Sequence, residues 1–329
     1  MSRAGGFASL TGLVIDGTCM KSTRGIHTID TGFFRPRFDA AYLIVEKGRG
    51  AFVDCGTNHS VPRLLEALEV AGLGVGEVDW LILTHVHLDH AGGAGELMAR
   101  LPNARLVVHP RGARHMIDPS KLWAGASAVY GEAVMEREYG RLRAVPAERV
   151  VEAGDGHVVD LAGRLLHCID TPGHARHHIA IHDPLANVCF TGDVFGLSYR
   201  EFDTRKGPFI LPTTSPVQFD PEELHASIDR LLALQPVAMY PTHFGRIEDV
   251  HRLGADLHVQ IDTMVSLALE AGTNLDRHAR LLDGLTELYA ARARAHGWTG
   301  GTAALEQLLH MDIELNAQGL EVWLDRTSG

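Results

Sequence analysis

The chain has 329 residues, of which 45% are hydrophobic, so it is long enough to bury a sizeable core. The formal net charge is −11 at pH 7 and no long run of Lys or Arg offsets it, which argues against nucleic acid as a partner. No segment approaches the roughly 18 consecutive apolar residues that a membrane span needs, and we expect no membrane association.

The cysteines indicate a reducing compartment. Cys19, Cys55, Cys168 and Cys189 are scattered and form no Cys-x-x-Cys pair, and three of them lie in apolar segments typical of strands. Such cysteines are typical of buried, reduced thiols. The first residues also lack the apolar core of a signal peptide, and we therefore expect a cytoplasmic protein.

The first part of the chain predicts short strands followed by a helix and a buried strand. Between residues 11 and 56, β-branched and aromatic residues cluster between glycines in four segments: GLVIDG, IHTIDTGF, AAYLIVEKG and GAFVDCG. Residues 61–71 carry leucines at helical spacing, and residues 78–84 form a continuous apolar run that is too short for a spanning helix. We therefore expect antiparallel strands at the beginning of the chain, followed by a helix and then a buried strand.

The middle of the chain mixes helices and strands. Helices are predicted over residues 111–143 and 221–234, and apolar segments between them predict further strands: RLVVHP, RLLHCID, HIAIHD, NVCFTGD and PVAMYPTHFG. These elements do not follow the strict strand-helix-strand alternation of a doubly wound parallel sheet. We therefore predict an α+β sandwich.

The chain becomes helical after residue 245. Apolar residues recur about every four residues there, as in Leu253, Leu257 and Ile261. We predict a main domain over residues 1–250 and a helical extension over residues 251–329. The extension would form either a lid over a site or the interface of a homodimer.

Four apolar, strand-like segments each end at a side chain that can bind a metal. The segment WLILT ends at His85, LLHCIDTPG at His174, NVCFTG at Asp193 and PVAMYPT at His243. Strand ends at one edge of a sheet can converge on one point, and a rigid sheet holds such a site in place. We expect these four side chains to meet.

The first of these ends opens the motif His-Val-His-Leu-Asp-His, which spans residues 85–90 and includes His87, Asp89 and His90. Imidazole nitrogen and carboxylate oxygen suit zinc, iron or manganese. The alternative is a polar loop satisfied by hydrogen bonds alone. Three imidazoles and one carboxylate within six residues favour a cation.

The four motifs together resemble the metallo-β-lactamase superfamily. His-x-His-x-Asp-His follows a buried strand, and Thr-Pro-Gly-His, Thr-Gly-Asp and Thr-His come after it in that order. The resemblance covers residues 20 to 250, and the segments TPGH and TGD are close to the glyoxalase II and lactonase branches. It implies an αββα sandwich with two metal ions, zinc first among the candidates, at one edge.

The resemblance also implies a role for each side chain. It assigns three residues to the first metal ion, three to the second and one to both: His85, His87 and His174; Asp89, His90 and His243; and Asp193. Asp54, in the segment VDCGT, would orient the metal-binding loop from behind. We interpret His178 in the same way, as a residue that packs behind the ligands.

The implied chemistry is hydrolysis of a small ester, thioester or lactone. Two metal ions about 3.5 to 4 Å apart can bridge a water molecule, lower its pKa to near neutrality and present hydroxide to a carbonyl or phosphoryl centre. Asp89 would orient the water or relay its proton. Glutathione specificity does not follow, because the tail motifs of glyoxalase II have no match here.

Residues 194–217 form a long, turn-rich segment after Asp193, and we predict that it binds the small-molecule substrate. The aromatic residues of this segment would line a pocket, and they are Tyr199, Phe202 and Phe209. Its basic residues would bind an anionic group of the substrate, and they are Arg200, Arg205 and Lys206. In the alternative, the aromatics only pack the loop onto the core. Four residues of the helical segment 111–143 could form the opposite wall or belong to the core: Trp123, Tyr130, Met135 and Tyr139.

Three other functions remain open. A di-iron redox or oxygen-binding protein can share this fold, but such relatives usually carry Glu where this chain has His87. A phosphodiesterase would use the same metals. A binding module without catalytic activity would lack one or more ligands, whereas all seven are present.

Overall fold

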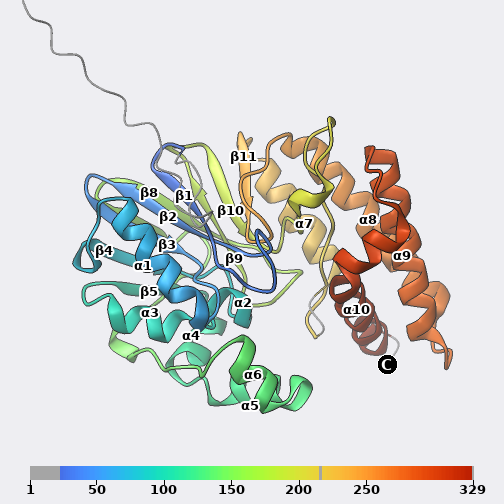
Figure 1. Ribbon diagram of the computed structural model, residues 1–329, viewed down its shortest axis with the longest axis horizontal. Helices are drawn as coiled ribbons and strands as arrows, with labels where there is room; N and C mark the ends of the chain where they lie inside the picture. The colour runs from blue at the N-terminus through green and yellow to red at the C-terminus, as the bar shows by residue number, and fades with distance from the viewer. Residues whose placement is uncertain (1–22, 215–216, 328–329) are drawn as a thin grey trace, which may run out of the picture.

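A computed structural model of the chain describes residues 23–214 and 217–327 (Figure 1). The predicted strand GLVIDG and Cys19 lie outside these ranges, as do residues 215 and 216 of the predicted substrate loop. Cys55, Cys168 and Cys189 are buried and free of disulfide bonds.

Two sheets form the centre of the fold. The first has the order β1 (Ile26–Asp30), β2 (Ala40–Glu46), β3 (Arg49–Val53), β4 (Val78–Ile82), β5 (Arg105–Val108) and β6 (Val150–Glu152). The second has the order β11 (Ala238–Pro241), β10 (Val188–Gly192), β9 (Ile179–Asp183), β8 (Arg164–Asp170) and β7 (Val158–Leu161). The first three strands pair antiparallel as predicted, and β3 to β6 pair in parallel. The short β6 and β7 were not predicted.

The sheets lie face to face, as the burial of β2 shows. Tyr42 and Ile44 belong to the hydrophobic cluster between the two sheets, whereas Ala41 and Leu43 belong to the cluster on the opposite face. Successive strand side chains point to opposite faces, so a strand covered on both sides has a continuous apolar sequence. This is why AAYLIVE contains no alternation of polar and apolar residues.

Helices cover both outer faces (Figure 1). Those on the first sheet and beside it are α1 (Val61–Val70), α2 (Leu88–Ala91), α3 (Ala94–Arg100), α4 (Pro110–Ile117), α5 (Ser120–Tyr130) and α6 (Glu132–Glu138). Those on the second sheet are α7 (Pro221–Leu232), α8 (Val250–Ala271), α9 (Arg277–His296) and α10 (Gly301–Thr327). The predicted αββα sandwich with C-terminal helices is confirmed.

The C-terminal helices share one hydrophobic cluster with the second sheet. Leu253, Leu257 and Ile261 of α8 are fully buried and belong to the same cluster as Cys189 of β10 and Met239 of β11. The periodicity of the leucines therefore reflects packing onto the sheet. The division at residue 250 coincides with the start of α8 and stays a prediction, as does the homodimer.

None of the helices in the described ranges is long and apolar enough to cross a membrane.

A buried ion pair joins the strands of the second sheet at one end. Arg164 of β8 donates from Nε to Oδ2 of Asp183 at 3.0 Å and from Nη1 to the carbonyl of Arg24 at 3.0 Å. The other carboxylate oxygen of Asp183 accepts from the backbone of the turn after β9. Because both side chains are buried, removing either one leaves an uncompensated charge.

We predict that Arg164→Met lowers the free energy of unfolding by about 3 kcal/mol, since Asp183 loses its buried partner. Urea unfolding of the metal-loaded protein measures this. Arg105→Met, at an exposed position on β5, is the control and should cost under about 0.5 kcal/mol. Equal stability of the two variants would contradict the role of the ion pair.

Candidate metal centre

The four predicted strand ends meet at one edge of the sandwich. His85 follows β4 and leads into the short helix α2, which carries Asp89 and His90. His174 follows β8, and Asp193 follows β10 directly. His243 follows β11, and with His87 these residues form two adjacent groups of potential metal ligands.

In the first group, three imidazole nitrogens face one another. Nε2 of His85 lies 2.8 Å from Nδ1 of His87, and Nε2 of His174 lies 3.2 Å from the same Nδ1. Oδ2 of Asp193 completes the group at 3.5 Å from Nε2 of His174. Nitrogen ligands of a tetrahedral zinc ion lie ~3.3 Å apart when each bond is about 2.0 to 2.1 Å. The spacing therefore suits a small divalent cation.

In the second group, Oδ2 of Asp89 lies 3.6 Å from Nε2 of His90 and 3.4 Å from Nε2 of His243. Oδ1 of Asp193 lies 3.4 Å from Nε2 of His90 and 3.7 Å from Nε2 of His243. The two oxygens of Asp193 thus belong to different groups. This one carboxylate is placed to bridge two ions.

Buried atoms without partners show that the residues fit metal ions. Nε2 of His90 and Oδ1 of Asp193 are buried, and among the described residues neither makes a hydrogen bond. A buried polar atom with no partner is costly, and a bound cation would satisfy both atoms at once. Because the donors are imidazole nitrogens and carboxylate oxygens only, they suit zinc, manganese and iron.

The imidazoles are oriented from behind by their other ring nitrogens. Nδ1 of His243 lies 3.0 Å from the carbonyl oxygen of Phe38, to which it can donate, and Nδ1 of His90 lies 3.0 Å from Oδ2 of Asp54. Each contact directs Nε2 of the same ring toward the group. Phe38 lies in the loop between β1 and β2, and nothing in its residue type predicted this role, because the acceptor is a backbone carbonyl.

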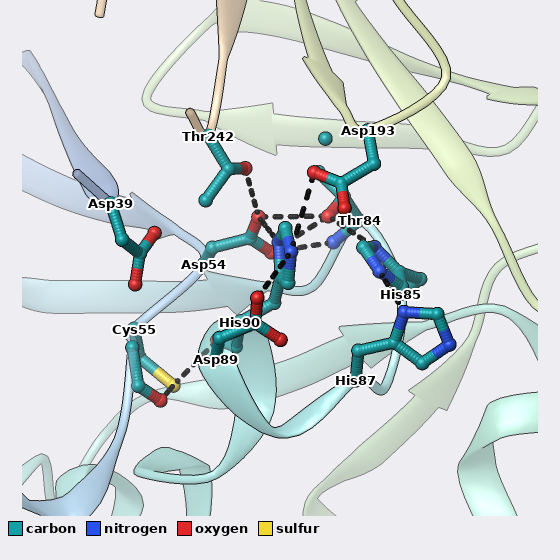
Figure 2. A network of polar contacts seen from close by, with 12 residues as sticks. Asp39, Asp54, Cys55, Thr84, His85, His87, Asp89, His90, Asp193 and Thr242 are labelled. Carbon is teal, nitrogen blue, oxygen red and sulfur yellow. Dashed lines mark hydrogen bonds and ion pairs between the residues drawn. The ribbon is translucent and has the colours of Figure 1, made fainter. Parts of the chain in front are cut away.

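Asp54 is the centre of the polar contacts in Figure 2. Its Oδ1 accepts from the backbone nitrogen of Thr84 at 2.8 Å, and its Oδ2 accepts from the hydroxyl of Thr242 at 3.0 Å. Thr84 and Thr242 directly precede the ligands His85 and His243. One buried carboxylate thus ties two of the ligand-bearing loops together and also holds His90.

Electrostatics within the second group favour cation binding. Burial lowers the pKa of His243, but the carboxylates of Asp193 and Asp89 outweigh burial and raise that pKa to about 9. Burial raises the pKa of Asp89, but His90 and His243 outweigh burial and hold that pKa at about 2. In the first group, burial and the neighbouring imidazoles lower the pKa of His85 well below its usual value. At neutral pH a proton on His243 therefore occupies the place of a cation, and a metal ion that binds would displace that proton.

His178 packs behind the first group. Its ring lies 5.0 Å from that of His85, and its Nδ1 lies 2.8 Å from the hydroxyl of Thr171. Gly192 passes so close that a Cβ there would lie 2.6 Å from Nε2 of His178 and 2.7 Å from the hydroxyl of Thr84. The glycine of the Thr-Gly-Asp motif is therefore required by space as well as by its φ of +48°.

A cavity of about 520 Å³ opens onto the metal ligands. His87, Asp89, His174, Asp193 and His243 line one end of it. The remaining walls are mostly apolar and come from the loop between β1 and β2, from α5 and α6, and from α10. The C-terminal extension therefore forms part of the wall of the site.

The four residues predicted to bind substrate do not line this cavity. Phe202 and Phe209 are buried and contact each other with ring centres 5.5 Å apart. Tyr199 is buried and donates its hydroxyl hydrogen to Asp312 at 2.9 Å. Arg200 donates to the carbonyl of Ser198 at 2.7 Å. The aromatic residues pack the loop onto the core, which was the alternative interpretation.

The loop does reach the cavity through four other residues: Leu197, Thr213, Thr214 and Val217. Its remaining cations also point elsewhere, since Lys206 donates to the carbonyl of Ala295 and Arg205 is exposed outside the cavity. On the opposite side, Tyr139 lines the cavity, whereas Met135 is buried in the core. The side chain of Tyr130 lies outside the described structure, and Trp123 does not line the cavity.

A family model described as the metallo-beta-lactamase superfamily matches residues 35–243. The match covers more than half of the chain and contains all seven ligands and Asp54. The chain therefore belongs to the metallo-β-lactamase superfamily.

Individual relatives share this region. The metallo-beta-lactamase fold-containing protein ST1585 of Sulfurisphaera tokodaii is 27% identical over 229 residues, which are 68% of this chain and 80% of that protein. A hydroxyacylglutathione hydrolase of Acidiphilium cryptum is 30% identical over 197 residues, 60% of each chain. The acyl-coenzyme A thioesterase MBLAC2 of Homo sapiens is 30% identical over 125 residues, 34% of this chain and 40% of that protein.

Among solved structures, the archaeal protein ST1585 from Sulfolobus tokodaii superposes with a TM-score of 0.64 at 25% identity. The superposition covers 91% of this chain and 99% of that one. More distant structures include a subclass B3 metallo-beta-lactamase and a peroxy diiron species of a chemotaxis sensor, with TM-scores of 0.53 and 0.52 at 16% and 18% identity. At that identity they show the shared fold alone.

We predict that Asp193→Ala abolishes dinuclear metal binding, because each group loses one donor and the bridge disappears. Metal analysis by mass spectrometry should find fewer than one ion per chain, against two in the unchanged protein. Asp283→Ala, at an exposed position on α9, is the control and should keep both ions. Two ions bound to Asp193→Ala would contradict the bridging role.

Asp54→Ala should weaken binding of the ion in the second group about 10- to 100-fold, since His90 loses the carboxylate that orients it. Competition with a chromogenic chelator measures the two affinities separately. The affinity of the first group should change less. If neither affinity falls below that of the Asp283→Ala control, Asp54 only stabilises the fold.

Proposed function

We propose that this chain is a metal-dependent hydrolase that cleaves a small ester, thioester or lactone at a dinuclear zinc centre. The observation that carries the proposal is the pair of ligand groups joined by Asp193 at one end of a cavity. Relatives named hydroxyacylglutathione hydrolase and acyl-coenzyme A thioesterase support a hydrolase.

Two bound divalent ions would lower the pKa of a water molecule and polarise the oxygen of the substrate. No serine or cysteine nucleophile is then needed. In agreement with this, Cys55 is fully buried, and burial raises the pKa of its thiol well above the usual value.

Asp89 is suited to handle protons in this reaction. It lines the cavity, and its side chain is 26% exposed, whereas that of the bridging Asp193 is 7% exposed. Its pKa of about 2 keeps the carboxylate ionised at neutral pH, so it can accept a hydrogen bond from the attacking water. We propose that Asp89 orients the attacking water and carries its proton toward the leaving group.

The charge of the cavity favours an uncharged ester or thioester over a phosphodiester. Among the described lining residues that are not ligands, Arg137 is the only arginine or lysine, and its Nε donates to Glu138 at 2.7 Å. The described lining therefore offers no cluster of arginine or lysine side chains that would hold a phosphate in addition to the proposed metal ions. A di-iron redox protein would contain iron in place of zinc, so analysis of the bound metal distinguishes it from the proposed hydrolase.

The test is a hydrolysis panel with thioesters, lactones, aryl esters and phosphodiesters, using enzyme loaded with zinc, manganese or iron. We expect turnover of a thioester or lactone that is lost on chelation and restored by zinc, and no turnover of phosphodiesters. Asp193→Ala serves as the inactive control and Asp283→Ala as the active one. Stoichiometric iron with a visible oxo-bridge band and no esterase activity would replace the hydrolase with a redox protein.

A further inference from the structure

We infer that the cavity beside the metal centre is an acyl-chain site, and that the preferred substrate carries an unbranched apolar acyl group of medium length. This inference rests on the proposed hydrolase function and adds the substrate class. Under this inference, substrates with a short, polar acyl group are not the preferred substrates.

Apart from the metal ligands, most of the residues that line the cavity are apolar. Phe33 and Phe34 contribute from the loop after β1, Leu122 from α5, and Met311 and Leu315 from α10. Because the metal ligands occupy the remaining end, a carbonyl held there would direct its acyl chain along these side chains. The volume of about 520 Å³ lies within the range of about 300 to 1,000 Å³ of small-molecule sites.

Arg137 is the only arginine or lysine among the described lining residues, and its Nε donates to the neighbouring Glu138 at 2.7 Å. The remaining carboxyl group in the wall, that of Asp312, accepts a hydrogen bond from Tyr199, and burial raises its pKa to about 6. An anionic acyl group placed among the apolar side chains would therefore lose its hydration without gaining a cation, whereas the transfer of an alkyl chain out of water is favourable.

Two lining residues expose apolar surface that a bound chain would cover. Phe34 is 52% exposed and Val217 is 61% exposed, and both belong to the same cavity. Phe34 contacts Phe33 with ring centres 4.2 Å apart, so the exposed ring continues the buried aromatic wall. Apolar surface beside a polar reaction centre is typical of a ligand site.

The first experiment measures kcat/KM for N-acetylcysteamine thioesters with straight acyl chains of about two to twelve carbons. These leaving groups are small and uncharged, so differences arise from the acyl chain. We expect kcat/KM to rise about fourfold per methylene, which corresponds to about 0.8 kcal/mol for each buried CH₂, until the cavity is full. Equal kcat/KM for all chain lengths would overturn the inference.

A matched pair of variants on α5 tests the position of the chain. Ala126 lines the cavity, and Ala124 is exposed on the same helix and does not. Ala126→Phe should shorten the cavity and lower kcat/KM for the longest substrates about tenfold, with acetyl thioester unaffected. Ala124→Phe should match the unchanged enzyme at every length. Identical chain-length profiles for the two variants would overturn the inference.

A binding measurement separates the inference from the proposed function. Straight-chain carboxylic acids are titrated into zinc-loaded protein, with isothermal calorimetry as the readout. We expect affinity to increase with chain length and Ala126→Phe to remove the increase. If affinity follows chain length but no thioester is hydrolysed, the acyl site stands and the hydrolase proposal fails. If thioesters are hydrolysed but affinity ignores chain length, the hydrolase stands and the acyl site is refuted.

Discussion

Crowding of nitrogen and oxygen lone pairs at one sheet edge is the constraint on which the structure depends. Within each ligand group all donor atoms lie within 4.8 Å of one another, and most of the side chains are buried. Such an arrangement is stable only with a cation or with protons between the donors. The buried contacts of Asp54 and the close approach of Gly192 serve the same arrangement, because they keep the donors in place against their mutual repulsion.

The metal site could be predicted from sequence because its signals are local. Each ligand follows an apolar strand, and parallel or adjacent strand ends meet at one edge of a sheet, so residues far apart in sequence could be expected together. Asp54 could be predicted through its motif. The carbonyl of Phe38 could not, because any residue type supplies a carbonyl and only the path of the loop brings it to His243.

The cavity walls could not be predicted for a related reason. The long loop after Asp193 contains aromatic residues, but composition does not tell whether an aromatic side chain faces a cavity or the core. Phe202 and Phe209 face the core, where they meet the C-terminal helices. Met311 and Leu315 have the spacing of an ordinary amphipathic helix, and their position at the cavity depends on how α10 packs on the rest of the chain.

The placement of α10 separates residues that shape the cavity from the residues that would hold the metal ions. The metal ligands lie between residues 85 and 243, whereas Met311 and Leu315 follow the last of them by more than one complete helix. Substitutions at these two positions can reshape the cavity without replacing any metal ligand or any residue that orients one. The architecture therefore allows the preferred compound to change through α10 alone, with the same strand ends holding the same metal ions.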